Sequence, residues 1–195
     1  MLNPTPTVAE VIADELKRAG VETVFGLPGG ENVDVLDAIR RAGITYVLVH
    51  NESSAVFMAD ATARLTGKPG VCMTTLGPGA ANAVAGVAHA HLDRAPVLII
   101  TPQIPDDRLP HETHQYIDIA ALYAPITKGT FKLQPHDART NIRRALELLG
   151  QGRPGPVHLQ VTREDAVKRA SETESARNRT TTPPAREKDF DMARD

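Results

Sequence analysis

Apolar and polar positions along the 195-residue chain alternate between short continuous apolar runs and longer segments with an apolar residue every three or four positions. The first periodic segment follows Thr7, with Glu10 placed to complete a capping box, and Gly20 ends it. The periodic segments predict helices and the apolar runs predict strands. The predicted helices cover residues 8–19, 33–40, 53–65, 80–92, 119–123 and 138–149, and the predicted strands cover residues 23–26, 44–49, 71–75, 97–101, 127–133 and 157–161.

This order of elements predicts the fold class. Strands that alternate with helices form right-handed βαβ units, which build a parallel sheet with helices on both faces. The strand segments are nearly continuous apolar runs, such as "VLIIT" at residues 97–101, which is typical of strands buried on both faces. We therefore predict an α/β fold: one three-layer αβα domain over residues 1–165, with a mostly parallel sheet of about six strands.

The C-terminal end has a different composition. Residues 170–195 contain few large apolar side chains, which is typical of a linker rather than of a packed domain. We expect residues 166–195 to form a linker or tail toward a middle domain, so that the chain is the first domain of a longer protein. An ordinary frayed C-terminus is the alternative.

Composition narrows the class of protein. The 22 Lys and Arg residues nearly balance 24 Asp and Glu residues, so charge favours neither nucleic acid nor an anionic membrane as a partner. Cys72 is the only cysteine, which excludes a disulfide scaffold. The N-terminus lacks the pattern of a signal peptide, and no apolar run approaches the roughly 20 residues of a membrane span. We expect a cytoplasmic protein.

Three segments with chemical potential follow predicted strands. They are "GLPGG" at Gly26–Gly30, "HNE" at His50–Glu52 and "TTLGPGAAN" at Thr74–Asn82. Ligands of open α/β sheets bind outside the carboxyl ends of the strands, and glycines let backbone amides approach a ligand closely. Neither Gly-rich turn is a P-loop. Tight turn geometry explains each turn taken singly, and the helix dipole explains Glu52 taken singly.

Together, these segments resemble a known family. "VFGLPGG", "HNESSAVFMADATARLTGKPGV" and "TTLGPGAANAVAGVAHAHLDRAPVLIIT", in this order, resemble the N-terminal, pyrimidine-binding domain of thiamine-diphosphate-dependent enzymes, and "GRPGPVHLQVTRED" resembles the end of that domain. The acetolactate synthase and 2-oxoacid decarboxylase group is the most similar. The resemblance covers about residues 5–165 and implies an enzyme that decarboxylates a 2-oxoacid and joins the product to a second molecule.

The resemblance assigns a role to Glu52. In the family, a glutamate at this position hydrogen-bonds the pyrimidine ring of thiamine diphosphate and promotes the imino tautomer that takes the thiazolium proton. The cofactor supplies the electron sink, and the protein supplies placement and electrostatics. Glu52 is thus the predicted catalytic residue and a cofactor-binding residue.

The resemblance also implies further site residues. The predicted cofactor-binding residues besides Glu52 are Gly77, Pro78, Gly79, Asn82 and Gln115, and the predicted substrate-side residues are Gly29, Gly30, His114 and Gln115. His111 and His114 lie in a loop where decarboxylases of the family carry a histidine pair, although exposed loop histidines are common. A metal site of His111, Glu112 and His114 is not expected, because the spacing is loose and nothing completes it.

The resemblance implies that this chain holds half of a cofactor site. The family binds the diphosphate through Mg²⁺ with a Gly-Asp-Gly motif in a C-terminal domain, and no Gly-Asp-Gly occurs here. We expect a homodimer or homotetramer formed through the face around Glu52. Helices 53–65 and 80–92 are candidate contacts, and simple packing on the sheet is the alternative for either helix. The use of FAD is not decidable from this part of the family's sequence.

Several alternatives stay open. Asn51 directly before Glu52 is more typical of pyruvate-type decarboxylases, since acetolactate synthases usually place a histidine there. Simple decarboxylation is therefore the alternative reaction. A separate small subunit of a two-chain decarboxylase and a non-catalytic interaction domain derived from the family are the alternative proteins.

Overall fold

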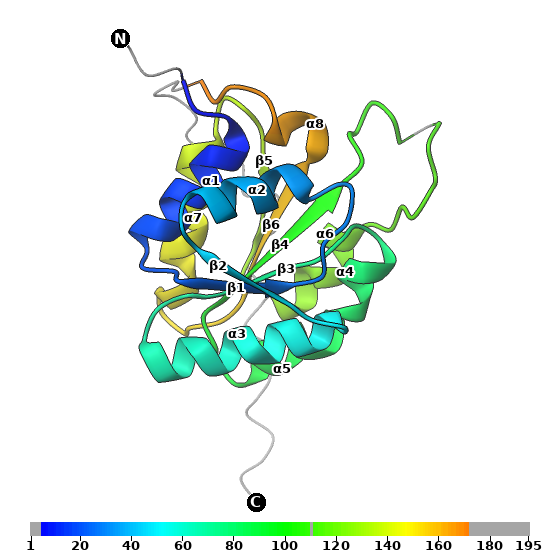
Figure 1. The fold of residues 1–195 in the computed structure, drawn as a ribbon. Coiled ribbons are helices and arrows are strands. Elements are labelled where there is room, and N and C mark those ends of the chain that lie inside the picture. The colour runs from blue at the N-terminus through cyan, green and yellow to red at the C-terminus, as the bar shows by residue number, and fades with distance from the viewer. Residues whose placement is uncertain (1–4, 110, 172–195) are drawn as a thin grey trace, which may run out of the picture.

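The computed structural model describes residues 5–109 and 111–171 of the chain, which form a parallel sheet with helices on both faces (Figure 1). The six strands are β1 (Thr23–Gly26), β2 (Thr45–Leu48), β3 (Gly70–Met73), β4 (Val97–Gln103), β5 (Thr130–Leu133) and β6 (Val157–Thr162). The helices are α1 (Val8–Arg18), α2 (Val33–Arg41), α3 (Glu52–Thr66), α4 (Pro78–Asn82), α5 (Val84–Leu92), α6 (Ile119–Tyr123), the 3₁₀ helix η1 (Ala124–Ile126), α7 (Ala138–Gly150) and α8 (Arg163–Ala166).

All six strands pair in parallel, in the order β2-β1-β3-β4-β6-β5. Two hydrophobic clusters separate the layers. One packs α1, α2 and α7 against the sheet, and the other packs α3, α4, α5 and α6 against the opposite face (Figure 1). The predicted three-layer α/β domain is confirmed, and every strand pair is parallel rather than most of them.

Local signals place most helix ends. Thr7 and Glu10 form the predicted capping box at the start of α1, with Thr7 N donating to Glu10 Oε2 over 2.8 Å. Gly67 ends α3 in a left-handed conformation with φ of +69°, which glycine adopts without steric cost. These ends depend on neighbours in the sequence, so the sequence predicts them within one or two residues.

The predicted helix over residues 80–92 is wrong as a single helix. It is two helices, α4 and α5, which meet at Ala83. The carbonyl groups of α4 accept side-chain hydroxyl groups from other elements: Tyr123 donates to Ala80 O over 2.7 Å, and Ser53 donates to Asn82 O over 2.5 Å. These two bonds hold the short helix at its own angle, and no pattern within residues 80–92 indicates them.

Three smaller differences concern the carboxyl edge and the end of the sheet. The strand β4 runs two residues past the prediction, because Pro102 and Gln103 continue the pairing with β6. The strand β5 is shorter than predicted and starts at Thr130. The helix α8 was not predicted, and Thr162 caps it by accepting a hydrogen bond from Asp165 N over 3.0 Å.

The residues that follow β6 remain packed on the domain up to Ser171. Ala170 N donates to Pro6 O and Ser171 N donates to Pro135 O, each over 2.8 Å. The domain boundary after residue 165 stays a prediction, and residues 172–195 of the predicted linker lie outside the described residues. Among the described helices, none is long and apolar enough to cross a membrane.

Candidate functional site

The order of the strands brings the three motif segments to one edge of the sheet. β1 lies between β2 and β3, and the chain leaves the carboxyl end of each of the three strands into one of the segments. After β1 the chain forms α2 on one face, whereas after β2 it forms α3 on the other face. The boundary between β1 and β3 is therefore the topological switch point, where open α/β sheets bind ligands.

Glu52 is the first residue of α3 and is only 6% exposed. It is not the residue that caps the helix, because Asn51 Oδ1 accepts the hydrogen bond from Ser54 N over 3.2 Å. Instead, Glu52 Oε2 accepts a hydrogen bond from Asn82 Nδ2 over 2.5 Å. A buried carboxylate with a side-chain donor from another helix is unlike a plain dipole-stabilising residue, which is ordinarily exposed.

The turn after β3 is built from glycine because other residues would collide with its surroundings. Gly77 has φ of +53°, and a methyl group on it would lie 1.8 Å from Gln115 O. A methyl group on Gly79 would lie 2.1 Å from Thr75 Oγ1 and 3.2 Å from Glu52 Oε1. The turn thus packs against the backbone of Gln115 at Gly77 and against the Glu52 carboxylate at Gly79. Pro78, between the two glycines, is the first residue of α4.

The turn after β1 is joined to the turn after β3 through Asn32, which is 2% exposed. Asn32 Oδ1 accepts from Gly29 N over 2.9 Å, and Asn32 Nδ2 donates to Thr74 O over 2.9 Å. A methyl group on Gly29 would lie 2.5 Å from Thr75 Cγ2, whereas nothing lies within 4 Å of that position on Gly30. Gly29 is packed into the site and Gly30 faces open space.

Sequence reasoning did not select Asn32 or Thr75. The available signal for Asn32 was its position just before α2, where asparagine is common as a cap. The structure uses its amide differently: the side chain makes no cap hydrogen bond to α2 and bridges two turns instead. Asn82, which was selected, does lie on Glu52.

The loop between β4 and α6 contributes unequally. Gln115 is brought to Gly77, whereas His111 and His114 are exposed, and no described contact joins them to Glu52. Glu112 Oε2 accepts from Arg108 Nε over 2.7 Å, so this carboxylate is an ion-pair partner. Within residues 5–109 and 111–171, no group of three His, Cys, Asp or Glu side chains is arranged to hold a metal ion.

A cavity of about 440 Å³ lies at the same edge of the sheet, over β4, β5 and β6. Its lining includes Gln103, Lys132, Gln160 and Thr162, and none of the residues predicted for the site lines it. The carboxylate and the two glycine turns are thus separate from this cavity. Their arrangement at the switch point, rather than the size of an enclosed space, identifies them as the candidate site.

Comparisons with known proteins show which family this chain is similar to. Residues 6–122 match the family model "Thiamine pyrophosphate enzyme, N-terminal TPP binding domain". The chain is 38% identical over 157 residues to a probable acetolactate synthase large subunit of Methanocaldococcus jannaschii, which covers 80% of this chain and 27% of the relative. It is 42% identical over 163 residues to an acetolactate synthase of Arthrospira platensis, which covers 81% of this chain and 28% of the relative.

A third relative is similar over the same part. The chain is 37% identical over 158 residues to the acetolactate synthase isozyme 3 large subunit of Escherichia coli, which covers 80% of this chain and 28% of the relative. The chain therefore spans about a quarter of the length of the curated relatives that it matches.

Proposed function

The chain belongs to the thiamine pyrophosphate enzyme family, as an N-terminal TPP-binding domain, and from this premise we propose that it acts in a longer 2-oxoacid enzyme. Within that enzyme, residues 1–165 are the pyrimidine-binding domain, and residues 166–195 lead toward a middle domain. The reaction is decarboxylation of a 2-oxoacid followed by carboligation, as the names of its acetolactate synthase relatives suggest. By itself, this domain is inactive.

The observation that carries the proposal is the pair of Glu52 and Asn82 at the switch point. Glu52 Oε2 accepts a hydrogen bond from Asn82 Nδ2, and the Gly79 turn passes close to Glu52 Oε1, which would lie 3.2 Å from a methyl group on Gly79. A flat aromatic ring with a nitrogen atom fits such a place, because a buried carboxylate forms a strong hydrogen bond in a medium of low dielectric constant. The residues present therefore fit the pyrimidine ring of thiamine diphosphate.

In this proposal, each predicted residue has a limited task. Glu52 holds a proton between its carboxylate and the pyrimidine ring, and Asn82 fixes the orientation of that carboxylate. Gly77, Pro78 and Gly79 shape the wall beside the ring. When bound, thiamine diphosphate supplies the nucleophilic carbon and the electron sink of the reaction. Gly29, Gly30, Gln115 and His114 face the substrate.

The proposal places the rest of the cofactor site outside this chain. A C-terminal domain holds the diphosphate through Mg²⁺, since carboxylate and amide oxygens of a dedicated motif suit that ion. The face around Glu52 then meets a second subunit in a homodimer or homotetramer.

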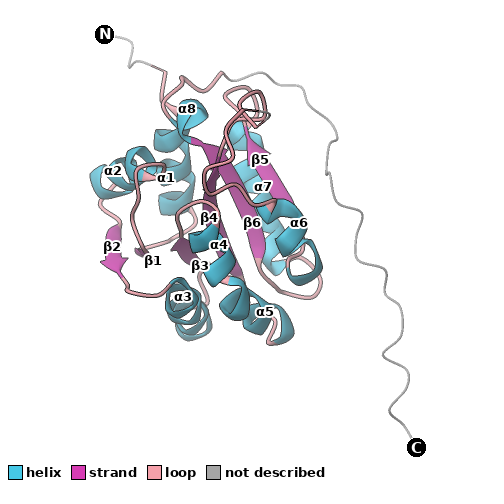
Figure 2. Cartoon of the chain, turned by 90° about the vertical axis from the view of Figure 1, so that its right-hand side faces the viewer, coloured by secondary structure: helices cyan, strands magenta, loops and turns pink. Residues whose placement is uncertain are grey.

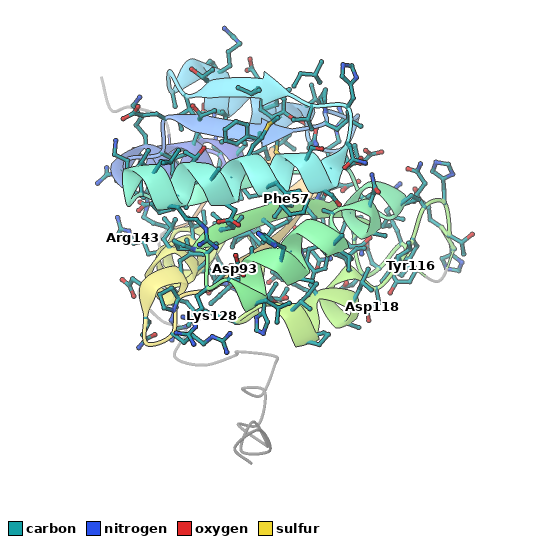
Figure 3. The ribbon with its side chains drawn as sticks, turned by 90° about the horizontal axis from the view of Figure 1, so that it is seen from below. Phe57, Asp93, Tyr116, Asp118, Lys128 and Arg143 are labelled. Carbon is teal, nitrogen blue, oxygen red and sulfur yellow. The ribbon has the colours of Figure 1, made fainter. Side chains whose placement is uncertain are left out.

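Exposed apolar side chains support the location of that interface. Leu48 at the end of β2 is 56% exposed, and Phe57 and Met58 on α3 are more than 40% exposed. Phe57 lies on the outer side of α3 where α5 passes, and its ring contacts His89 at a centroid distance of 5.1 Å (Figure 3). Apolar groups gathered on neighbouring surface elements mark a protein interface in many proteins.

Two functions other than carboligation are the alternatives. A decarboxylase, as a domain or as a separate small subunit, uses the same Glu52 and differs in the fate of the product. A non-catalytic interaction domain does not need Glu52, and burial of a carboxylate costs stability unless it is bonded. The retained pair of Glu52 and Asn82 favours an enzyme.

The test is a substitution in the full-length protein. We expect Glu52→Gln to lower thiamine-diphosphate-dependent consumption of pyruvate by about 100-fold or more, the size of a lost acid–base group. Glu147→Gln is the matched control, because Glu147 is an exposed residue of α7. Wild-type turnover in the Glu52→Gln variant would reject the assignment, and acetolactate against acetaldehyde as the product separates carboligation from simple decarboxylation.

A further inference from the structure

Two large polar side chains are completely buried beside the site without belonging to it. Tyr123 ends α6 and His158 is the second residue of β6, and both are 0% exposed. Their rings meet edge to face, with centroids 4.8 Å apart and an angle of 65° between the planes. The pair lies on the face of the sheet that α3, α4 and α5 cover.

His158 is held on both ring nitrogens. Its Nε2 lies 2.8 Å from Thr101 Oγ1 and its Nδ1 lies 3.1 Å from Thr130 Oγ1. These two threonines come from β4 and β5, the strands on either side of β6. Burial lowers the pKa of His158 to about 3, so the ring is neutral and each nitrogen has one defined role. The imidazole is therefore held in one position, and the Tyr123 ring packs against it.

The Tyr123 hydroxyl group points from this wall to α4. It donates to Ala80 O over 2.7 Å, and the backbone carbonyl of Tyr123 accepts from Thr127 Oγ1 over 2.9 Å. Burial raises the pKa of Tyr123, so the phenol keeps its proton and remains a donor. Tyr123 is therefore held at its backbone by Thr127 and at its hydroxyl group by Ala80 O. A donor held in this way fixes the position of the Ala80 carbonyl group.

The helix α4 has only five residues, and two hydroxyl groups from other elements bind its carbonyl groups: Tyr123 at Ala80 O and Ser53 at Asn82 O. Asn82 lies two residues after Ala80, at the end of α4, and its side chain donates to Glu52. Figure 2 shows α4 between α3, which carries Glu52, and α6, which carries Tyr123. The path from the sheet to the carboxylate is thus His158, Tyr123, α4, Asn82 and Glu52.

Stability does not require this arrangement. A buried hydrogen bond adds little net stability, and well-packed apolar side chains of the same shape do as well. What a satisfied buried network adds is a single defined position for the elements that it joins. A tyrosine at this place is therefore better explained by the position of α4 than by the strength of the core.

We propose that Tyr123 is a positioning residue, which sets the Asn82 side chain against Glu52 by anchoring α4 through Ala80. This inference rests on the proposed function for its effect on turnover, but its geometry concerns residues of this chain alone. It is distinct from the assignment of Glu52, because it concerns what holds the Asn82 side chain against the Glu52 carboxylate.

The first readout needs no cofactor. In the 195-residue chain, NMR measures the chemical shifts of the Asn82 side-chain amide protons, which depend on their hydrogen bond to the Glu52 carboxylate. We expect Tyr123→Phe to move these signals toward those of the Asn82 amide in a Glu52→Gln variant. Thr127→Val is the matched control, because it removes a buried hydroxyl-to-carbonyl bond at the same tyrosine without touching α4. Unchanged Asn82 signals in Tyr123→Phe would overturn the proposal.

The second readout is a double-mutant cycle in the full-length enzyme. Tyr123→Phe should lower kcat by about fivefold, the worth of one buried hydrogen bond. In an Asn82→Ala background the same change should have no further effect, because both act through one contact. Additive losses would contradict positioning through Asn82.

The readouts also separate this inference from the proposed function. A full-length protein without thiamine-diphosphate-dependent turnover rejects the proposed function, and the Asn82 signals still decide the positioning role. If Tyr123→Phe does not fold, the wild-type chain decides. A slowly exchanging Tyr123 hydroxyl proton with a nuclear Overhauser contact to Ala80 supports the anchor, and a rapidly exchanging one without that contact rejects it.

Discussion

Replacement of Gly77 by alanine tests the turn that joins the Gln115 loop to the site. Gly77 has φ of +53° and ψ of −113°, a conformation that costs other residues about 1–3 kcal/mol. The new methyl group would also lie 1.8 Å from Gln115 O, so the loop would have to move away to restore ordinary contact at 3.4 Å or more. Such overpacking costs about 1–3 kcal/mol more. We expect a total loss of about 2–6 kcal/mol.

Gly43 provides the matched control. It has φ of +71°, and nothing lies within 4 Å of the position where a methyl group would be added. Gly43→Ala therefore carries the strain of a positive φ without a collision and should cost about 1–2 kcal/mol. Urea unfolding of both variants of the 195-residue chain measures the difference. Equal losses in the two variants would refute the close approach of Gln115 to the turn.

Two further predictions concern pH and assembly. Burial lowers the pKa of His158 from 6.5 to about 3, so the unfolded chain binds a proton that the folded chain lacks. The contribution of His158 to stability is therefore complete above pH 6.5, and the free energy of unfolding falls by about 1.4 kcal/mol per pH unit below it. Urea unfolding between pH 6.5 and 4.5 should show a smaller loss of unfolding free energy in His158→Gln than in the wild type. Equal pH dependences in the two proteins would contradict the burial of His158. Phe57→Asp should shift the full-length protein toward monomers in sedimentation velocity, whereas Val167→Asp, at another exposed apolar residue, should not. An unchanged assembly in Phe57→Asp would place the interface elsewhere.

The parts of the fold that were predictable depend on short-range signals. The capping box of Thr7 and Glu10 and the glycine after α3 mark helix ends within a few residues of the helices they end. The apolar runs of β3 and β4 are buried along their whole length, as their composition indicates. For these elements, tertiary structure and local preference agree.

The parts that were missed depend on distant residues. The break between α4 and α5 arises where Tyr123 and Ser53 supply hydroxyl groups to carbonyl groups of α4, from 43 and 29 positions away. Pro102 does not end β4. Proline has no backbone N–H group to donate, but its carbonyl group can still pair with the neighbouring strand. Neither effect leaves a trace in the local pattern.

The candidate site divides in the same way. Glu52, Asn82 and the two glycine turns were selected by their place after strands and by resemblance, and the structure brings them together. Asn32 was missed because its role is to bridge two turns that lie 42 residues apart. The resemblance also suggested His114, which the described contacts leave exposed in its loop.

The central claim, that Glu52 activates the cofactor, is tested most directly by proton exchange. The rate at which the thiazolium carbon of bound thiamine diphosphate exchanges its proton for deuterium is measured in the full-length protein by rapid quench and NMR. We predict that Glu52→Gln slows this exchange by about 100-fold or more while Glu147→Gln does not change it. Exchange at the wild-type rate in Glu52→Gln, with the cofactor bound, would contradict the account.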